Sequence, residues 1–444
     1  MVHNNLDRRS FLKHAAGGAV AAPVFIRNLL GAPPSDQLRL ASFGAGGMAY
    51  YTLDGIASHK SVSLTCVAEV DSERVAQMRQ KYQNVKVYTD WRQMLEKERG
   101  GIDIACVGTP DHMHAPIAMS AMRMGIPVYV QKPLAHNIHE IRHLTEYARK
   151  KNLVTQMGIQ VHSRTEYRTA VALVQSGAIG KVKEVHSWSE KKWGDPEMMP
   201  DRKDEVPPNL DWNQWLGVAE SRPYIGNAYY HPGNWRKRID FGTATFGDMG
   251  CHIIDPVFGA LGLTAPVSVR SEGPAPTQHN WALNSVIHYV FPGTAVTEGK
   301  TVNVTWYDGD ERPPQEVQAL IGSQKMPGQG SIFIGTKGVM LLPHTAMPVL
   351  LPEDQFRDFA MPKQESVHHY HQFVDAVLGK EKTTASFDYS GPLTESVLLG
   401  PLATRFPKTT LEWNSKKMKF TNSAEATRLV KRQYRDGWKV KGLS

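Results

Sequence analysis

Cysteine is scarce in this chain of 444 residues, which contains only Cys66, Cys106 and Cys251. These residues form no Cys-x-x-Cys pair, and three cysteines cannot build a disulfide framework. If Cys66 and Cys106 lie on two strands of one sheet with a third strand between them, about two 4.8 Å spacings separate them, which is too far for a disulfide. We therefore expect three free thiols.

Long apolar runs and dense basic runs are also missing. No stretch of ~18 apolar residues is present, so no membrane-spanning helix is predicted. The formal net charge is +8, but part of that excess lies in residues 1–32 and the rest is spread along the chain, which argues against nucleic-acid binding. No internal repeat or low-complexity linker is visible. Because the length exceeds the ~250–300 residues at which a single core stops growing, two domains are expected.

The pattern after residue 37 is that of a strand, a glycine-rich turn and a helix. Residues 38–43 read LRLASF, and GAGGMA follows at residues 44–49. In this context Gly44 permits a tight turn, Gly46 lets a pyrophosphate approach the backbone, and the small Ala49 packs the helix against the strand. The helix N-terminus would face the phosphates. Taken alone, the turn is equally compatible with an ordinary glycine-rich loop. If it is a dinucleotide site, the residues predicted to bind the cofactor here are Gly44, Gly46, Gly47 and Met48.

An acidic residue follows the next β-prone run, residues 63–68, some two dozen residues after Gly44. A carboxylate at this point accepts hydrogen bonds from the ribose hydroxyls of a dinucleotide. We favour Glu69 for that role, because Asp71 precedes a helical pattern and is typical of a helix N-cap. A negative charge here would repel a 2′-phosphate, which favours NAD over NADP.

Strand and helix patterns continue to alternate up to residue 150. Strands are expected at residues 85–88, 102–107 and 128–130, and helices from Asp90, after His112 and over residues 138–150. Such βα alternation predicts an α/β fold with a doubly wound parallel sheet, a Rossmann domain over residues 37–157. Its ligand would lie beyond the carboxyl ends of the strands, where Thr109 and Gln131 would join Gly44 and Glu69.

Several motifs then occur in order along the chain. They are GTPDHMH at residues 108–114, VQKPL at 130–134, GIQ at 158–160, GDMGCHIID at 247–255 and QYRDGW at 433–438. In these motifs the sequence resembles the glucose-fructose oxidoreductase and inositol dehydrogenase family, Gfo/Idh/MocA. The resemblance covers nearly everything after residue 37, and its independent motifs make it specific.

The resemblance implies a carboxyl-terminal α/β domain, residues 158–444, whose open and mainly antiparallel sheet faces the nicotinamide. It implies that Lys132 of the Glu-Lys-Pro motif is catalytic and that Asp248 and His252 form the Asp-x-x-x-His pair. Gln131 stands where the motif has a glutamate. The glutamine keeps a hydrogen-bond acceptor at this position but lacks the negative charge beside Lys132. The outer face of the sheet commonly mediates oligomers in this family, so a homodimer or homotetramer is expected. The cofactor site that the motifs imply also includes Thr109, Pro110, His114, Gln131, Lys132 and Gln160.

The same residues are suited to alcohol oxidation on chemical grounds. Oxidising a secondary alcohol requires a base for the hydroxyl proton and a cation or donor for the developing alkoxide, with hydride leaving to the nicotinamide. His252 is suited to the first role and the Lys132 ammonium to the second. If Asp248 and His252 lie one helical turn apart, their side chains share a face. Each of the three residues could instead be structural, since lone histidines near apolar runs are often packed or capping residues.

Histidine clusters do not lead us to predict a metal site. His112 and His114 lack a cysteine or carboxylate set that would complete one, so we interpret His114 as a residue near the nicotinamide ribose. His368, His369 and His371 begin an amphipathic helix expected at residues 367–378, where His368 and His371 share a face. That helix is expected to be solvated or to lie at the edge of the substrate site.

Residues 186–240 are rich in tryptophan and proline and contain half of the chain's ten tryptophans. Flat indoles beside polar side chains are suited to a sugar, whose C–H faces stack on aromatic rings while its hydroxyls take polar partners. Short β-like runs at residues 285–291, 302–306 and 331–334 are expected to form the second sheet. The predicted substrate-binding residues are Arg164, Tyr167 and Arg168, following a strand at residues 158–160, together with Tyr230, Trp235 and Arg236.

Three functions are compatible with these residues. The first is a dehydrogenase of a sugar or polyol with tightly bound NAD. The second is an NAD-dependent glycosidase, in which oxidation at C3 acidifies the C2 proton, elimination cleaves the glycosidic bond and the hydride returns. The third is a non-enzymatic sugar-binding or cofactor-binding role, in which Lys132 and His252 would not be needed for turnover. The identity of the sugar does not follow from the sequence.

The first 32 residues resemble an export signal. Residues 8–13 read RRSFLK and precede a short, weakly apolar stretch at residues 15–26, a pattern typical of a twin-arginine signal. A disordered basic tail is the alternative, because Asp7 replaces the usual Ser or Thr and no clean cleavage site follows. Export by this route carries folded proteins, so a cofactor would be loaded before export to the periplasm.

Overall fold

Six parallel strands form the first sheet of the computed structural model, which describes residues 37–444. The predicted twin-arginine segment, residues 1–32, lies outside the described residues. The spatial order β3-β2-β1-β4-β5-β6 confirms the doubly wound sheet. Its strands are β1 (Leu38–Phe43), β2 (Val62–Ala68), β3 (Lys86–Tyr88), β4 (Ile104–Val107), β5 (Val128–Gln131) and β6 (Thr155–Gly158). Cys66 and Cys106 lie on β2 and β4 with β1 between them, and all three cysteines are free and buried, as expected.

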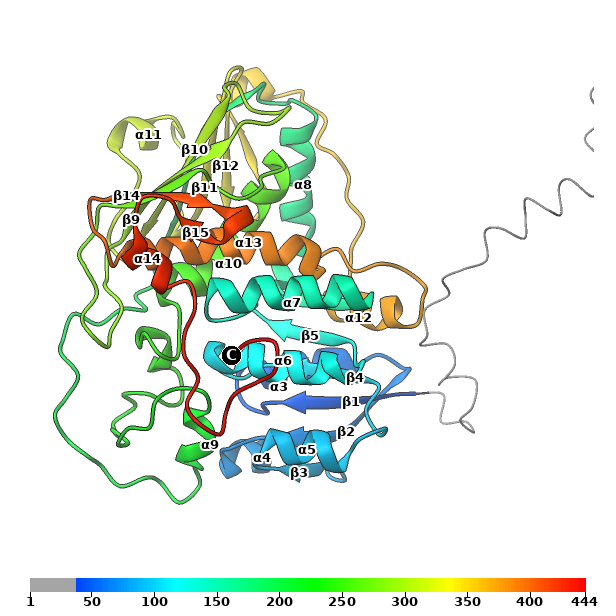
Figure 1. Ribbon diagram of the computed structural model, residues 1–444. Helices are drawn as coiled ribbons and strands as arrows, with labels where there is room; N and C mark the ends of the chain where they lie inside the picture. The colour runs from blue at the N-terminus through cyan, green and yellow to red at the C-terminus, as the bar shows by residue number, and fades with distance from the viewer. Residues whose placement is uncertain (1–36) are drawn as a thin grey trace, which may run out of the picture. The chain divides into compact units, whose positions relative to one another are not determined.

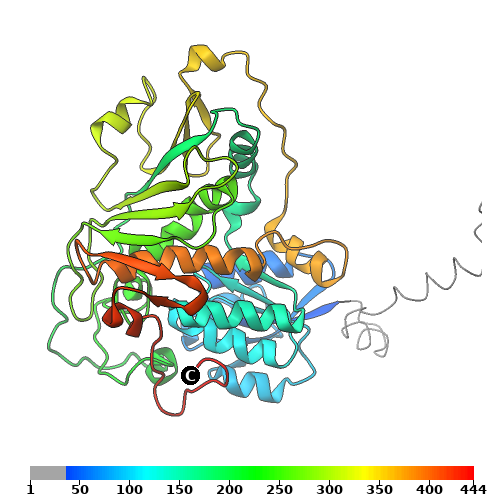
Figure 2. The same ribbon diagram turned by 45° about the horizontal axis from the view of Figure 1, so that its top comes forward.

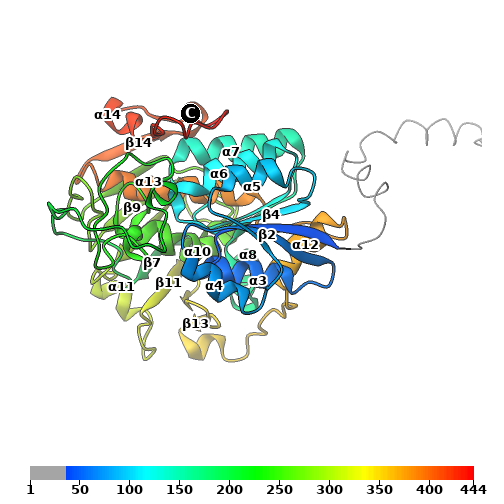
Figure 3. The ribbon, with the colours of Figure 1, turned by 90° about the horizontal axis from the view of Figure 1, so that it is seen from below.

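Helices cover both faces of this sheet, α3 and α4 on one side and α5, α6 and α7 on the other (Figure 3). Side chains cap three of them: Asp71 accepts from the N–H of Glu73 in α4, Asp90 caps α5, and Asn137 caps α7. The N-cap role predicted for Asp71 is confirmed. The helices are α3 (Met48–Ala57), α4 (Ser72–Arg79), α5 (Trp91–Lys97), α6 (His114–Arg123) and α7 (Ile138–Lys151).

The second sheet is open and has nine strands in the order β13-β12-β11-β7-β10-β9-β8-β14-β15. Only the central pair β7 and β10 is parallel, so the sheet is mainly antiparallel, as predicted. The strands are β7 (Val182–Ser189), β8 (Ser268–Ser271), β9 (Val286–Pro292), β10 (Thr301–Asp308), β11 (Gln329–Gly335), β12 (Val339–Pro343), β13 (Val349–Leu351), β14 (Thr410–Asn414) and β15 (Lys419–Phe420).

Two long buried helices, α10 (Ala244–Leu261) and α13 (Phe387–Ala403), lie between the second sheet and α7 (Figure 1). They share the core with α8 (Thr165–Gln175), and α10 packs on the second sheet by stacking Phe246 on Trp306 at 4.5 Å between ring centroids. This arrangement places one face of α10 at the carboxyl end of the first sheet. The Asp-x-x-x-His motif lies on that helix.

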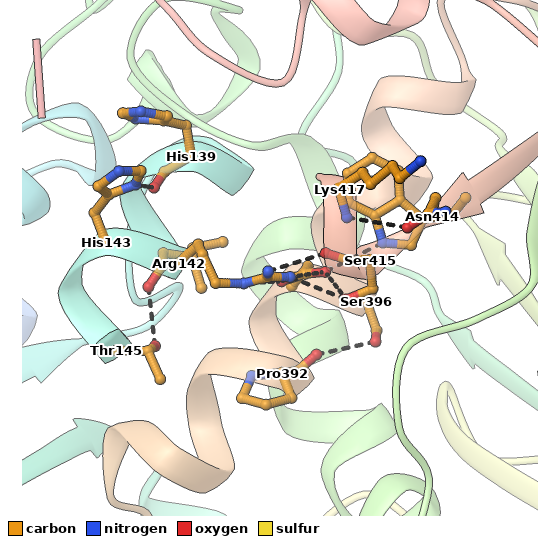
Figure 4. A network of polar contacts seen from close by, with 12 residues as sticks. His139, Arg142, His143, Thr145, Pro392, Ser396, Asn414, Ser415 and Lys417 are labelled. Atoms are coloured by element: carbon orange, nitrogen blue, oxygen red, sulfur yellow. Dashed lines mark hydrogen bonds and ion pairs between the residues drawn. The ribbon is translucent and has the colours of Figure 1, made fainter. Parts of the chain in front are cut away.

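A buried polar network joins α7 to α13 and to the chain after β14 (Figure 4). The Arg142 guanidinium donates to both carboxylate oxygens of Glu395, at 2.6 to 3.2 Å, and to the carbonyl and hydroxyl of Ser415 at 2.9 Å. Glu395 is 4% exposed and also accepts from the Trp413 indole at 3.1 Å. The charges of Arg142 and Glu395 therefore compensate each other inside the protein, and the network holds α7 against α13.

The remaining elements are short. The helix predicted at residues 367–378 is confirmed as α12 (His369–Val377), which His368 caps, with the His368 and His371 rings 3.7 Å apart. The strand predicted at residues 158–160 is wrong at its end, because β6 stops at Gly158 and the chain turns into a 3-10 helix. The other elements are α9 (Trp212–Leu216), α11 (Gln315–Ala319), α14 (Ala424–Arg428) and the 3-10 helices η1 (Asp111–Met113), η2 (Gln160–Ser163), η3 (Asn234–Lys237), η4 (Glu353–Phe356) and η5 (Ser415–Lys417).

The segment after α14, dark red in Figures 1 and 2, returns to the first sheet's helices. Arg92 of α5 lies over the Trp438 ring at 4.1 Å, and Arg435 donates to the side chain of Asn213 on α9. The carboxyl-terminal motif thus ties α5 to the tryptophan-rich segment. Within residues 37–444, no helix is both long and apolar enough to cross a membrane.

Candidate active site

A cavity of about 310 Å³ opens at the carboxyl ends of the first sheet's strands. This is where a doubly wound sheet binds its ligand. Its walls come from the glycine turn, the ends of β2, β4 and β5, helix α10 and the tryptophan-rich segment. Of the predicted cofactor residues, the following line it: Gly44, Gly46, Gly47, Met48, Glu69, Thr109, Pro110, His114, Gln131 and Lys132.

The glycine turn has the backbone that the sequence pattern requires. Gly44 has a φ of +101°, and a Cβ there would lie 2.9 Å from the Ala49 Cβ. A Cβ on Gly108 would lie 2.7 Å from the same atom, so Ala49 packs the helix directly against two strand ends. Gly46 faces a different neighbour, because a Cβ there would meet the Arg74 side chain at 2.6 Å. Arg74 lines the cavity beside the turn, a position that no sequence motif indicated.

Glu69 lies in the cavity wall with its carboxylate against the glycine turn. One oxygen accepts from the N–H of Ala45 at 2.7 Å, and the other accepts from Val70 and Asp71 at 2.8 and 3.1 Å. Burial raises the pKa of Glu69, and these three N–H donors oppose that rise. The carboxylate thus holds the turn in place as well as facing the cavity, whereas Asp71 is occupied as a helix cap.

Four buried polar atoms in the cavity wall have no hydrogen-bond partner among the described residues. Buried polar atoms are normally paired, so four such atoms on one cavity indicate that a polar ligand completes them. They come from four different parts of the wall: α5, the loop after β4, α9 and α10. The atoms are Trp91 Nε1, Thr109 Oγ1, Gln214 Oε1 and His252 Nδ1.

Lys132 follows β5 directly and reaches α10 at the end of the cavity. Its ammonium donates to the Asp248 carbonyl and to the Asp248 carboxylate, each at 2.7 Å. The Arg236 Nε donates to the same carboxylate oxygen at 3.2 Å. Burial alone would raise the pKa of Asp248, but the Lys132 and Arg236 charges outweigh it and hold the pKa below its ordinary value. Asp248 lies behind Lys132 rather than in the cavity wall, and it remains ionised.

His252 lies one turn after Asp248 on α10, as the spacing predicts, and lines the cavity. Burial, and then the nearby Lys132 charge, lower its pKa well below the ordinary value. Its imidazole is therefore neutral at pH 7 and available to accept a proton. Asp248, one turn away, opposes the lowering by its negative charge.

His114 is held on both sides by backbone. Its two ring nitrogens lie 2.7 Å from the carbonyl oxygens of Thr109 and Pro133, and burial lowers its pKa to about 4. A neutral ring donates to only one of these carbonyls. Both ring nitrogens face backbone carbonyls, so His114 ties the loop after β4 to the segment that carries Lys132.

Gln131 and Gln160 contact helix α3 from two directions. Gln131 donates to the Thr52 hydroxyl at 2.7 Å, and Gln160 donates to the Tyr370 hydroxyl at 3.1 Å and to the Met48 sulfur at 3.4 Å. Gln131 lines the cavity, whereas Gln160 does not. The neutral amide of Gln131 leaves Asp248 as the carboxylate that pairs with Lys132.

Asp111 is a cavity residue that sequence reasoning missed. It is 4% exposed, accepts from the Thr243 hydroxyl at 2.8 Å and lines the cavity near Lys132 and Arg236. Burial raises its pKa to about 7, and the Thr243 hydrogen bond opposes the rise. Asp111 lies inside the 108–114 motif, so its place next to Pro110 was a usable signal.

The predicted substrate residues fall into two groups. Trp235 and Arg236 line the cavity, and the Arg236 guanidinium lies 4.3 Å from the Trp235 ring centroid. Tyr230 is 1% exposed inside an aromatic cluster of the tryptophan-rich segment, so it does not reach the cavity.

The second group is separated from the cavity because η2 turns the chain after Ile159. Arg164 pairs with Glu166, and Arg168 donates to the Glu365 carbonyl. Tyr167 bonds to the His344 ring at 2.6 Å, and that ring lies 6.0 Å from the ring of His252. The expectation that Arg164, Tyr167 and Arg168 share the cavity with Trp235 is not met by this arrangement.

The tryptophan-rich segment closes over the cavity and is fastened to the first sheet at Asp71. The Asp71 carboxylate lies 2.9 Å from the His231 Nε2 and accepts from the Asn209 amide at 2.8 Å. Burial would raise the pKa of Asp71, but the contacts with Asn209 and His231 hold it below its ordinary value. Gln214, Trp215 and His231 of this segment line the cavity. We call the His231–Asp71–Asn209 contacts the latch.

Comparison with known proteins gives distant relatives over part of the chain. Levoglucosan dehydrogenase of Pseudarthrobacter phenanthrenivorans is 22% identical over 189 residues, 43% of this chain and 40% of that protein. The scyllo-inositol 2-dehydrogenase (NAD(+)) of Bacillus subtilis is 27% identical over 146 residues, 33% of this chain and 42% of that protein. An α-N-acetylgalactosaminidase of Shewanella oneidensis is 24% identical over 209 residues, 40% of this chain and 45% of that protein. The matches thus span less than half of each relative.

Solved structures share the fold over most of the chain. The WlbA dehydrogenase of Chromobacterium violaceum, in complex with NADH and UDP-GlcNAcA, has a TM-score of 0.61 at 13% identity, covering 89% of this chain and 99% of that one. GenD2 from gentamicin A biosynthesis, in complex with NAD, has a TM-score of 0.56 at 17% identity, covering 87% and 99%.

Family descriptions cover most of the described chain. Residues 38–159 match the NAD-binding Rossmann fold of the oxidoreductase family, and residues 172–440 match that family's C-terminal α/β domain. The chain therefore belongs to the Gfo/Idh/MocA oxidoreductase family, which confirms the resemblance seen in its motifs.

Proposed function

We propose that this protein oxidises a secondary alcohol of a sugar, glycoside or polyol by hydride transfer to bound NAD. The observation that carries the proposal is the Lys132–Asp248 pair near neutral His252 in the cavity that the glycine turn and the strand ends of the first sheet line. A cation and a neutral base next to each other supply the two groups that alcohol oxidation needs. Bound NAD supplies the hydride acceptor.

Lys132 is the group that stabilises the developing alkoxide. An ammonium has three N–H donors, and two of them are taken by the carbonyl and carboxylate of Asp248. The third is left for the substrate hydroxyl oxygen. Asp248, whose carboxylate also accepts from Arg236, holds the lysine. The donor is therefore oriented before the charge develops, which is the condition for electrostatic catalysis.

His252 takes the hydroxyl proton. Its lowered pKa keeps it neutral at pH 7, and the Asp248 carboxylate one turn away stabilises the positive charge that forms on the ring. The negative charge of Asp248 thereby stabilises both the Lys132 ammonium and the protonated ring of His252. Trp235 and Arg236 offer an aromatic face and hydrogen-bond donors to the rest of the sugar.

Tight retention of NAD is part of the proposal. The latch holds the tryptophan-rich segment over the cavity through one carboxylate with two side-chain partners. Charge-assisted hydrogen bonds of this kind are about twice as strong as neutral ones. Because this segment forms part of the cavity wall, the latch should slow the release of a bound cofactor, which suits a protein that is loaded before export.

A redox-assisted glycosidase is the second candidate, and Asp111 favours it. A buried carboxyl with a pKa of about 7 is half protonated near neutral pH, so it can donate a proton to the leaving glycosidic oxygen. The α-N-acetylgalactosaminidase relative supports the same chemistry. In that reaction oxidation at C3 is transient, and the Lys132 and His252 roles are unchanged.

Two measurements on the full chain test both candidates. Mass spectrometry of the purified, denatured protein identifies the released cofactor, and a screen of free sugars and glycosides follows the absorbance of reduced nicotinamide. A net dehydrogenase gives absorbance that persists after one equivalent of substrate until an acceptor is added. A glycosidase gives a transient rise and solvent deuterium at C2 of the released sugar. A protein that neither contains nor binds a nicotinamide would refute both candidates.

Two further proposals concern the whole protein. We infer export to the periplasm from the RRSFLK run at residues 8–13, and assembly into a dimer or tetramer through the outer face of the second sheet, as is common in the family. Native mass spectrometry measures the assembly state, and a monomer at micromolar concentration would contradict it.

A further inference from the structure

We propose that a second cavity is a binding site for a small organic anion, a carboxylate or phosphate on a body no larger than a hexose. This cavity has a volume of about 220 Å³ and lies between the start of α7, the end of α13 and the segment after α14. No residue lines both cavities. The inference therefore goes beyond the proposed oxidation and stands independently of it.

Three cations and one acid line this cavity: Arg405, Lys431, Arg432 and Asp240. The acid is already neutralised from another side, because the Arg222 guanidinium donates to the Asp240 carboxylate. Arg432 is also occupied, since it donates to the Asp240 carbonyl at 2.9 Å and lies 3.3 Å from the His136 Nδ1. Arg405 and Lys431 are then left without an acid in direct contact among the described residues.

Arg405 is the cation whose environment most calls for an anion. Its guanidinium makes no hydrogen bond to any described residue, and burial lowers its pKa, with Asp240 opposing from a distance. Arg405 is half-buried, so its guanidinium is only partly solvated, and its five N–H donors have no acceptor on the described protein. A planar carboxylate or a phosphate can accept two of these donors at once.

Asn137 supplies a second, neutral donor. It is 9% exposed, and its side-chain oxygen accepts from the Glu140 N–H at 3.0 Å to cap α7. The amide nitrogen of the same side chain is buried in the cavity wall without a partner. Because the capping bond takes the amide oxygen, the nitrogen is left as a donor for an acceptor in the cavity.

Most of the rest of the wall is apolar, which is why an organic anion fits better than a bare ion. Trp281 is 7% exposed, and its indole nitrogen is already taken by the Gly242 carbonyl at 2.8 Å, so its ring offers only apolar surface. Leu398 and Leu402 of α13 extend that surface. His136 adds no charge, since burial, and then Arg432, lower its pKa to about 3.

The second cavity also borders the catalytic one through Thr243. This residue lines the second cavity, and its hydroxyl donates to Asp111 in the first at 2.8 Å. An anion in the second cavity would therefore contact the residue that holds Asp111.

Binding is tested on the full chain saturated with NAD, so that phosphates cannot enter the first cavity. The probes are inorganic phosphate, gluconate, glucose 6-phosphate and benzoate, followed by calorimetry and tryptophan fluorescence. We expect at least one organic anion to bind saturably at one site per chain, more tightly than inorganic phosphate. Arg405→Gln and Lys431→Gln should each weaken that binding at least tenfold, and Trp281→Phe should remove the fluorescence change.

Lys183→Gln is the matched control, because it removes one exposed charge from β7 in the second sheet, and Arg405→Lys tests whether charge alone suffices. Circular dichroism and thermal unfolding verify that each variant folds. No saturable binding of any probe would overturn the proposal. Equal weakening by Lys183→Gln, or unchanged affinity in both folded Arg405→Gln and Lys431→Gln variants, would do the same.

Discussion

At the residue scale, the charges of Lys132 and Asp248 are stabilised mainly by each other and only to a small extent by solvent. Their side chains are 11% and 15% exposed, and their contact is 2.7 Å. A partly buried pair of this kind orients both groups, and removal of one leaves the other charge poorly solvated. The lysine is therefore positioned by α10, although it directly follows β5 of the first sheet.

Lys132→Ala should lower the rate of hydride transfer by about 10²–10³-fold with a verified substrate, since the donor to the alkoxide is lost. His252→Ala should slow the same step strongly below neutral pH and less at high pH, where hydroxide can replace the base. Stopped-flow absorbance of reduced nicotinamide measures both. Lys183→Ala, on the surface of β7, is the control. Wild-type rates in both catalytic variants would show that these residues serve the fold rather than the chemistry.

Glu69 is expected to set the preference for NAD. Glu69→Gln should keep an acceptor for the N–H of Ala45 and retain NAD, while losing the charge that repels a 2′-phosphate. Glu69→Ala should weaken NAD binding as well, because the acceptor disappears. Dissociation constants for NAD and NADP measure the two effects separately. Unchanged NAD retention and unchanged cofactor preference in Glu69→Ala would refute the assignment of Glu69.

Arg74 lies beside Gly46 in the same cavity. Arg74→Ala removes this cation and should shift the cofactor preference further from NADP.

Asp111 should leave a pH signature in stability. Its pKa in the folded protein is about 7, against ~3.9 in an unfolded chain. Between these values the folded state holds a proton that the unfolded state has lost, so the free energy of unfolding falls with rising pH by up to about 1.4 kcal/mol per pH unit from this group. Above pH 7 that loss is complete.

Asp111→Asn, which keeps an acceptor for Thr243, should remove this slope and be more stable than the wild type at pH 8. Urea unfolding between pH 4 and 8 measures it. Parallel pH profiles of the two proteins would contradict the assignment of a neutral Asp111.

At the element scale, helices α7 and α13 are joined by two ion pairs of very different burial. Arg142–Glu395 is buried, at 20% and 5% side-chain exposure, whereas Arg149–Asp388 is 60% exposed at both partners. Burial decides which pair matters, because solvent competes with an exposed pair and cannot reach a buried one.

Arg142→Met should lower the free energy of unfolding by roughly 3–5 kcal/mol, since it leaves the Glu395 carboxylate buried without its cation. Arg149→Met, on the same helix, should cost less than about 1 kcal/mol. Chemical denaturation compares the two. A double Arg142→Met/Glu395→Met variant should recover part of the loss, and equal effects of Arg142→Met and Arg149→Met would show that the network does not fix α7 against α13.

At the scale of the whole molecule, parts of the chain that are far apart in sequence form the proposed active-site cavity. The first sheet supplies the glycine turn and Lys132, α10 supplies His252, and the tryptophan-rich segment closes the cavity with Trp215 and Trp235. Folding must therefore be complete before a cofactor is enclosed, which is consistent with an export route for folded proteins.

Replacing Arg8 and Arg9 by Lys should keep folded, cofactor-containing protein in the cytoplasm of a host with a working twin-arginine pathway, because that pathway reads the arginine pair. Cell fractionation with detection of bound nicotinamide measures the outcome. The unsubstituted chain is the control, and equal amounts of both proteins in the periplasm would show that residues 8–13 are not such a signal.

The sequence alone determined the first sheet, the character of the second and the helix that carries Asp248 and His252. Gly44 and Ala49 predicted the glycine turn, because there is no room for larger side chains where α3 packs against the strand ends. The spacing of Asp248 and His252 placed both on one helix face, because an α-helix repeats every 3.6 residues. These are local properties of the chain, which neighbouring residues set.

Only the tertiary structure decided what surrounds those groups. Asp111 acquired its raised pKa and Tyr230 was buried in an aromatic cluster because segments far apart in sequence exclude water from them. Arg405 is half-buried without an acid in contact, because the segments that meet around it place none against its guanidinium. Arg164 and Arg168 point elsewhere because β6 ends at Gly158 and η2 turns the chain. Burial and hydrogen-bond partners depend on which distant segments pack against each other in the folded chain. Local patterns in the sequence do not specify these long-range contacts.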